Sequence, residues 1–178
     1  MGGSAELLAR QMEDAFSFIR RAVEGLTDDE FSWEPVPGSW RVYRGDDGRW
    51  TYDYQLPEPD PSPFTTIGWR LFHVASCKVM YHEYAFGPGR ITWDTIEVPH
   101  TAVDTVAMLE HGQALLVADV AALADPDLGE ERPTNWGERW PTWRILWTMV
   151  HHDLWHGGEI GAVRDLFRLR EDRSRSGR

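Results

Sequence analysis

The sequence predicts an all-α protein, a four-helix bundle with long aromatic-rich connections. Four segments carry apolar residues at alternating steps of three and four, the period of an amphipathic helix. Stretches containing Pro and Gly separate these segments. Four amphipathic helices of this length form a bundle core between them. Because no internal repeat or linker divides the 178 residues, we expect one domain over residues 1–170, followed by a basic, flexible tail over 171–178.

The first helix is predicted to begin at Ser4, which can cap its start, and to end near Gly25. Immediately afterwards, Thr27 and Glu30 have the spacing of a capping box, in which each side chain satisfies a free backbone amide of the other. This pattern predicts a short additional turn of helix.

A small β-hairpin is predicted between the first two long helices. Residues 40–44 and 49–54 are rich in aromatic and β-branched residues and flank the turn Gly-Asp-Asp-Gly. Two strands alone are only marginally stable, so the hairpin should pack on the bundle. Tryptophans in the connections admit two interpretations: walls of a ligand pocket, or packing that fixes the connections to the bundle. They are Trp33, Trp40, Trp50, Trp136, Trp140, Trp143 and Trp147.

The second long helix is predicted over about residues 66–86, with Thr65 or Thr66 as its N-cap. It is apolar on nearly all sides, so it should be the most buried element. Thr101, with Asp104 three residues later, is expected to begin the third helix, and an Asp-Pro pair ends it.

The fourth helix is predicted from near Pro141, which suits a first helical turn, to about Arg168. At about 100° per residue, His152 and His156 fall on the same face as the apolar residues, whereas His151 falls on a flank. Two inward imidazoles four residues apart can share one metal ion. The alternative is a pair of core histidines that are hydrogen-bonded to the backbone or to each other.

A metal site needs a further ligand, which another helix must supply. His73 is chosen because it lies in the apolar part of the second helix. Taken alone, a single histidine in an apolar helix is more often a hydrogen-bonded core residue than a ligand. The remaining histidines are less favourably placed, near a helix end, in a loop or off an apolar seam; they are His82, His100 and His111.

The segment TTIGWRLFHVA around His73, together with a His-x-x-x-His pair followed by Gly-Glu-Ile, resembles the DinB-like superfamily. That resemblance implies a four-helix bundle, commonly a dimer, which binds a divalent metal such as zinc or nickel through three histidines. Matched position by position, these ligands fall on His73, His152 and His156. The sequence departs from the family at Glu159, where many members have Gln.

Three neutral imidazoles leave a fourth position of a tetrahedral ion open to water, a thiolate or a substrate oxygen. Several DinB-like enzymes use low-molecular-weight thiols such as mycothiol or bacillithiol, as S-transferases or as a maleylpyruvate isomerase. The resemblance therefore implies a metal-dependent thiol S-transferase or isomerase acting on an electrophilic small molecule, with mycothiol as cosubstrate.

Two further side chains near these histidines have alternative interpretations. Glu159 is the predicted catalytic residue, as an acceptor for a ligand imidazole N–H or as a proton acceptor, but it could also be a solvated carboxylate. Cys77, one helical turn from His73, could be a fourth ligand, although a buried Cys is ordinarily a small apolar core residue.

Two other functions fit the same sequence pattern. The same ligands could serve a non-catalytic bundle that binds a metal or another ligand. The sequence from His152 to His156 is also H-D-x-x-H, one methylene short of the H-E-x-x-H of metalloproteases. That metallohydrolase alternative makes Asp153 the general base and needs a third ligand further along the chain.

Composition excludes several classes of partner. Lys and Arg number 18 against 29 Asp and Glu, a net charge of -11, which argues against a nucleic-acid or anionic-membrane surface. We interpret the arginines near the C-terminus as a solvated helix end. No apolar run approaches the roughly 18 residues that span a bilayer, and the N-terminus lacks the pattern of a signal peptide. With Cys77 as its single cysteine, the chain is expected in the cytoplasm.

Overall fold

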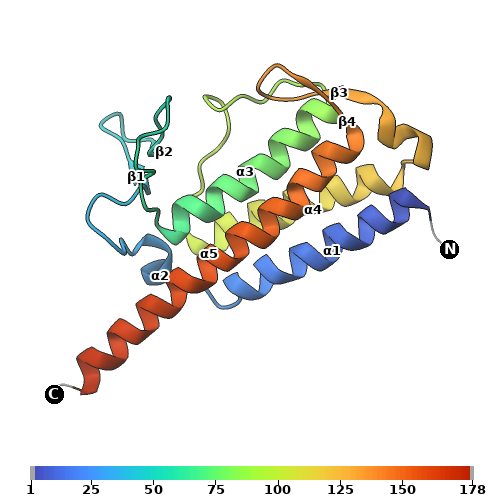
Figure 1. Cartoon of the computed structure of the whole chain (residues 1–178). Helices are drawn as coiled ribbons and strands as arrows, with labels where there is room; N and C mark the ends of the chain where they lie inside the picture. The colour runs from blue at the N-terminus through green and yellow to red at the C-terminus, as the bar shows by residue number, and fades with distance from the viewer. Residues whose placement is uncertain (1–2, 177–178) are drawn as a thin grey trace.

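The computed structural model describes residues 3–176 of the chain, and side chains over residues 3–170. Its body consists of four long helices that lie side by side (Figure 1), as the sequence predicts. They are α1 (Ser4–Val23), α3 (Ile67–Ala85), α4 (Ala102–Ala121) and α5 (Thr142–Ser176). Helix α1 packs mainly on α5, and α3 packs on both α4 and α5. The apolar faces of the four helices meet in the core, and α3 is buried on nearly all sides.

Most helix ends are fixed by residues next to them in the sequence. Thr66 and Thr101 accept hydrogen bonds from backbone amides three residues on and so cap α3 and α4. Thr27 and Glu30 form the predicted capping box of the short helix α2 (Asp28–Ser32). Gly25, just beyond α1, has φ 63°, a left-handed conformation that favours glycine.

The predicted cap of α1 is wrong. Ser4 is already the first helical residue, and its side chain makes no capping hydrogen bond. Instead, the backbone amides of Ser4 and Ala5 each donate to the carboxylate of Asp125 over 2.9 Å. Asp125 is the first residue of the 3-10 helix η1 (Asp125–Gly129). This segment is far from α1 in the sequence but contacts it in the folded chain.

Two β-hairpins lie in the connections outside the four-helix bundle. The predicted one pairs β1 (Val42–Arg44) with β2 (Trp50–Tyr52), and the Tyr52 ring packs against Phe72 of α3 at 4.9 Å between centroids. The second, β3 (Glu131–Pro133) with β4 (Arg139–Pro141), was not predicted. Pro141 therefore ends a strand, and α5 begins one residue later.

Helix α5 is longer than predicted. It continues to Ser176, past the expected end near Arg168, and projects beyond the other helices (Figure 1). The predicted flexible tail, residues 171–178, falls on residues whose side chains lie outside the described part of the chain.

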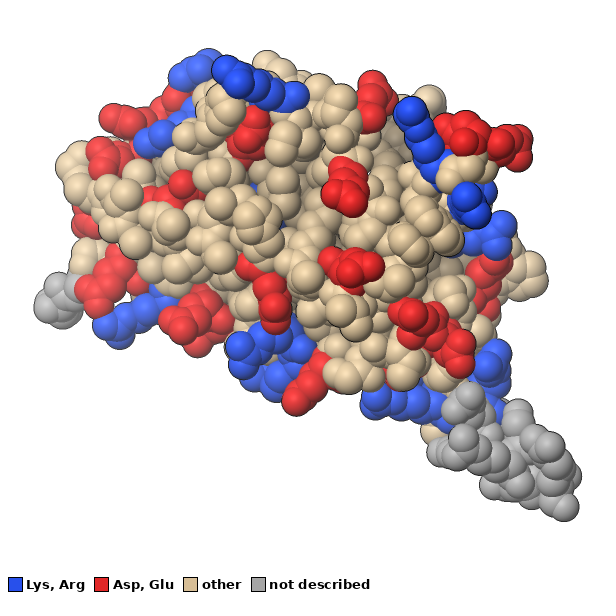
Figure 2. Space-filling view, turned by 180° about the vertical axis from the view of Figure 1, so that it is seen from behind, with Lys and Arg blue, Asp and Glu red and all other residues tan. Residues whose placement is uncertain are grey.

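The surface agrees with the acidic composition. Acidic side chains are spread over the face in Figure 2, and basic side chains form smaller groups among them. None of the helices in the described range is long and apolar enough to cross a membrane.

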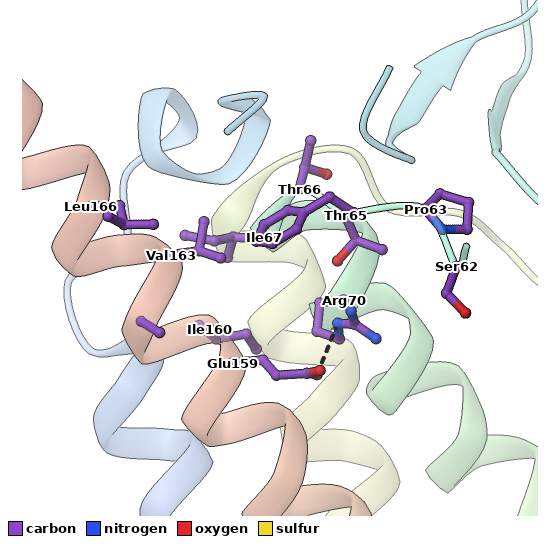
Figure 3. Close-up of a pocket in the computed structure, with 12 residues that line it drawn as sticks. Ser62, Pro63, Thr65, Thr66, Ile67, Arg70, Glu159, Ile160, Val163 and Leu166 are labelled. Atoms are coloured by element: carbon purple, nitrogen blue, oxygen red, sulfur yellow. Dashed lines mark ion pairs between the residues drawn. The ribbon is translucent and has the colours of Figure 1, made fainter. Parts of the chain in front are cut away.

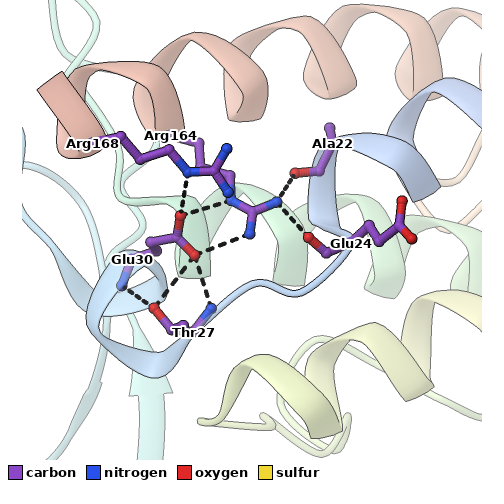
Figure 4. A network of polar contacts seen from close by, with 6 residues as sticks. All are labelled: Ala22, Glu24, Thr27, Glu30, Arg164 and Arg168. Carbon is purple, nitrogen blue, oxygen red and sulfur yellow. Dashed lines mark hydrogen bonds and ion pairs between the residues drawn. The ribbon is translucent and has the colours of Figure 1, made fainter.

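A buried ionic network joins α5 to the connection after α1 (Figure 4). Arg164 donates two hydrogen bonds to Glu30, of 2.8 and 3.1 Å, and two more to the carbonyls of Ala22 and Glu24. Arg168 adds a hydrogen bond of 3.1 Å to the same carboxylate. Burial would raise the pKa of Glu30, but Arg164, the Thr27 amide and Arg168 outweigh it and lower the pKa to about 2.

Replacing Glu30 by glutamine is expected to cost about 3 kcal/mol at pH 7, because Arg164 stays buried without its charge partner. Since the folded pKa of Glu30 lies below the ordinary 4.5, this contribution is present above pH 4.5 and is lost as pH falls toward 2. Denaturant unfolding of both proteins over this range measures it. Glu34→Gln, which breaks the exposed pair with Arg41, is the control and should cost under about 1 kcal/mol. A Glu30→Gln cost that did not change with pH would contradict the assignment.

Candidate metal centre

Three histidines from two helices converge inside the bundle. His73 of α3 and His152 and His156 of α5 each offer a nitrogen, and these atoms all lie within 4.8 Å of one another. The His73 ring lies 5.6 Å from that of His152 and 5.1 Å from that of His156, between centroids. The structure thus brings together all three predicted ligands.

The helical period places the α5 histidines as expected. His156 is buried in line with the core residues Met149 and Ile160, and His152 is partly buried. His151 is exposed on the flank, where its ring stacks on Trp147.

The other histidines lie outside this cluster. Nδ1 of His82 is 2.7 Å from the carboxylate of Asp119, on the opposite side of α3. His100 stacks on Trp50 with 4.2 Å between ring centroids, and His111 is exposed.

Hydrogen bonds at Nδ1 orient both imidazoles of α5. His152 Nδ1 is 3.0 Å from the carbonyl oxygen of Thr148, and His156 Nδ1 is 2.6 Å from Oε2 of Glu159. If each Nδ1 carries the proton and donates it, Nε2 of each ring is left as the free lone pair. This tautomer suits metal binding, because a partner on one ring nitrogen fixes the direction of the other.

The surroundings keep the three imidazoles neutral. Burial lowers the pKa of His73 well below its ordinary value, and His156 and His152 lower it further. Burial, then Arg70 and His152, lower the pKa of His156 to about 3. Burial also lowers the pKa of His152, although its bond to Thr148 opposes the shift. Neutral imidazole is the form that binds a metal.

The donor set fits a divalent ion. In a tetrahedral zinc site with bonds of 2.0–2.1 Å, ligand nitrogens lie about 3.3 Å apart. Small side-chain rotations would bring nitrogens within 4.8 Å to that spacing. Neutral nitrogen ligands suit zinc or nickel, whereas calcium and magnesium prefer oxygen.

Glu159 connects the centre to a residue that the sequence analysis missed. Its carboxylate accepts from His156 and lies 3.1 Å from Nε of Arg70, so it bridges the two. Figure 3 shows the ion pair with Arg70. Arg70 lies on α3, three residues before His73, and that helical spacing was the signal that could have identified it.

Replacing Glu159 by glutamine is expected to weaken zinc binding about tenfold, because the variant keeps an acceptor for His156 but loses the charge. Glu159→Ala, which removes the acceptor, should weaken it toward a hundredfold. Competition titration with a chromogenic chelator measures both affinities. Asp165→Asn, an exposed carboxylate on the same helix, is the control and should bind like the wild type. Equal affinities for Glu159→Ala and the wild type would contradict a supporting role.

Cys77 belongs to the apolar core rather than to the imidazole cluster. Burial raises the pKa of its thiol to about 12, although the charge of Lys78 opposes this. Its Sγ makes only a 3.9 Å contact with Nε2 of His73. Cys77 is thus a buried core thiol that is not one of the converging ligand atoms, although its sulfur lies next to the His73 ring.

The environment of Asp153 argues against the metallohydrolase alternative. This carboxylate is 1% exposed and accepts a hydrogen bond of 2.7 Å from Lys78, which is fully buried. Lys78 also donates to Gln113 of α4. Asp153 is therefore held in the core by its ion pair with Lys78, whereas a general base must reach the open position of the ion.

Two cavities meet near Arg70. One, of about 290 Å³, is lined by all three histidines together with Trp40, Trp69 and Trp155. The other, of about 340 Å³, is mostly apolar and has Arg70 and Glu159 among its lining residues (Figure 3).

The tryptophans of the connections divide between the two predicted roles. Trp40 lines the cavity above the histidines. Trp33 packs edge-on against Phe167 of α5, and Trp136 packs between Tyr81 and Trp140. Packing therefore accounts for Trp33 and Trp136, whereas Trp40 has the other predicted role, as part of a ligand pocket.

Fold and site together define a helical bundle with a three-histidine centre between two of its helices. The DinB superfamily pattern matches residues 11–160, so the chain belongs to the DinB superfamily. A crystal structure of a DinB-like protein from Bacillus cereus ATCC 10987 is similar in fold, with a TM-score of 0.61 and 16% identity. The match covers 90% of this chain and 91% of that one. No curated protein sequence matches the chain.

Proposed function

We propose that this protein binds a divalent metal, zinc or nickel, through His73, His152 and His156, and is a thiol S-transferase or isomerase. Its cosubstrate is a low-molecular-weight thiol such as mycothiol, and its second substrate is a small electrophile. The observation that carries the proposal is the convergence of three imidazoles at the wall of an aromatic cavity of about 290 Å³. A cavity beside an incomplete ligand set is the arrangement expected of a catalytic rather than a structural metal site.

A bound divalent ion would favour deprotonation of a coordinating thiol and so supply a thiolate nucleophile at neutral pH. The chain's residues hold and orient the reactants. His73 and the α5 histidines define the position of the sulfur, and Glu159 keeps the His156 ring in place. Trp40 and Trp69 cover the site and limit the access of water.

The proposed reaction begins with attack of the thiol sulfur on an electrophilic carbon. A sulfur–carbon bond forms, and the thiol proton passes to solvent. In a transferase the leaving group departs with its bonding electron pair. In an isomerase the same sulfur–carbon bond later breaks, the sulfur leaves with the bonding electron pair and takes back a proton, and the thiol is released unchanged. Glu159 is the proposed acid–base residue, because its carboxylate lines one cavity and its partner His156 lines the other.

Metal analysis of the purified protein, followed by titration of the cobalt-substituted form with mycothiol, tests the proposal. We expect about one ion per chain and a sulfur-to-cobalt charge-transfer band. Turnover of an electrophile panel should be lost in His152→Ala. Metal and thiol binding without turnover would favour the non-catalytic alternative, and absence of metal binding would overturn the proposal.

The proposal includes a homodimer in the cytoplasm. Helix α5 exposes a row of large apolar side chains that a second copy could cover: Trp143, Trp147, Leu154 and Trp155. The single cysteine, Cys77, is free, as expected in a reducing compartment. Analytical ultracentrifugation tests the dimer, and a monomer at micromolar concentration would contradict it.

A further inference from the structure

A third cavity, also beside the metal centre, has mostly aromatic walls. It encloses about 310 Å³, and His73 is the lining residue that it shares with the cluster of imidazoles. Five aromatic rings and one carboxylate supply the remaining lining, and we call this group the aromatic cage: Tyr52, Tyr54, Trp69, Phe72, Trp93 and Asp94.

The rings of the aromatic cage form inclined walls. Tyr52 lies 6.4 Å from Tyr54 and 6.5 Å from Trp93 between ring centroids, and each pair is inclined by 59°. With these separations, a cation in the cavity can lie within roughly 6 Å of more than one ring, the range over which cation–π attraction acts. The Phe72 ring packs against Tyr52 with 4.9 Å between centroids.

Core packing does not account for the outer rings. Tyr54 is 61% exposed and Trp93 is 36% exposed, so both keep much apolar surface in water. Large aromatic rings left around a hollow are typical of ligand sites rather than of a closed core.

Asp94 gives the aromatic cage a negative charge. Over the described part of the chain, its carboxylate forms no hydrogen bond or ion pair. It nevertheless acts on the cage, because burial first, and then Tyr54 and Asp94, raise the pKa of Tyr52. A free carboxylate beside several aromatic faces is complementary to a positively charged organic group.

The approach to the aromatic cage is also acidic. A wider groove of about 860 Å³ shares Tyr52, Tyr54, Trp93 and Asp94 with the cage. Its other charged lining residues are Asp47, Glu97 and Asp104 against Arg49, with His100 beside them. Such a field attracts cations and repels anions on the way in.

We propose that the aromatic cage binds an organic ammonium ion, such as a quaternary ammonium group carried by a small molecule. Cation–π contact with Tyr52, Tyr54 and Trp93 and the charge of Asp94 provide the recognition. This inference goes beyond the proposed function, because it requires neither a bound metal nor turnover. If both proposals hold, a substrate could place its cationic end in the aromatic cage and its reacting end at the histidines.

The proposal is tested by titrating the protein with choline and with its neutral isostere 3,3-dimethylbutan-1-ol. Tryptophan fluorescence and calorimetry measure the binding. We expect choline to bind at least about tenfold more tightly, since cation–π attraction is lost in the isostere. Trp93→Leu and Asp94→Asn should each weaken choline binding about fivefold or more, and Trp93→Phe should restore much of it. Thermal melts of each variant check that it folds.

Each control variant makes the same kind of substitution as a test variant, but at a residue outside the aromatic cage. Asp165→Asn removes an exposed carboxylate of α5 that lines neither the aromatic cage nor the outer groove, and Trp136→Leu removes an exposed ring elsewhere, so both should bind choline like the wild type. Equal affinity for choline and the isostere, or no choline binding at millimolar concentration, would overturn the proposal. His152→Ala separates the two proposals: it should lose metal but keep choline binding.

Discussion

Replacing His73 by alanine is expected to weaken zinc binding by more than about a hundredfold, beyond the 10–100-fold effect of residues that only support a ligand. The physical reason is that His73 is the cluster's only ligand from α3, so the two α5 imidazoles alone would remain. Competition titration measures the affinity. As a second readout, zinc at one hundred times Kd should stabilise the wild type by about 2.7 kcal/mol and leave the variant nearly unchanged.

His111→Ala is the matched control, because it removes an exposed imidazole from a neighbouring helix. It should bind zinc like the wild type. If His73→Ala also retained full affinity, the three-histidine centre would be wrong, and a pair on α5 with other partners would have to replace it. That outcome would reopen the metallohydrolase alternative that the position of Asp153 argues against.

Replacing Lys78 by methionine is expected to destabilise the metal-free protein by about 4 kcal/mol, because it leaves the buried Asp153 carboxylate without its counter-charge. The pair is among the most buried in the described chain, at 0% and 1% side-chain exposure. Oδ1 of Asp153 already has no hydrogen-bond partner there, so a lone carboxylate would have little to stabilise it. For a chain of this size, the melting temperature should fall by about 10 °C.

A double-mutant cycle separates the cost of a broken pair from the value of an intact one. Lys78→Met with Asp153→Leu removes both charges and should recover most of the stability that Lys78→Met loses, because an apolar pair of similar volume often replaces a buried ion pair at little cost. Glu6→Gln breaks the exposed pair with Arg10 and should cost under about 1 kcal/mol. A loss below about 1 kcal/mol for Lys78→Met would show that Asp153 takes up a proton or reaches water.

Local patterns carried much of the fold. Thr27, Thr66 and Thr101 cap the helices predicted for them, because a cap is a contact between residues two or three apart. The inward direction of His156 follows from the helical period alone. His73 was harder, since no local rule places a residue of α3 opposite two residues of α5. Its selection rested on the apolar segment around it and on the resemblance to DinB-like proteins.

The sequence by itself determined where the helices lie, which faces are buried and which three imidazoles could meet. Only the tertiary structure decided which distant groups pair: Asp125 with the start of α1, Lys78 with Asp153, Arg70 with Glu159, and Arg164 with Glu30. The period of a helix is a property of neighbours along the chain, whereas these pairs depend on the packing of segments that are dozens of residues apart. Four of these charged side chains, Lys78, Asp153, Glu30 and Arg164, are buried because that packing supplied each with an opposite charge.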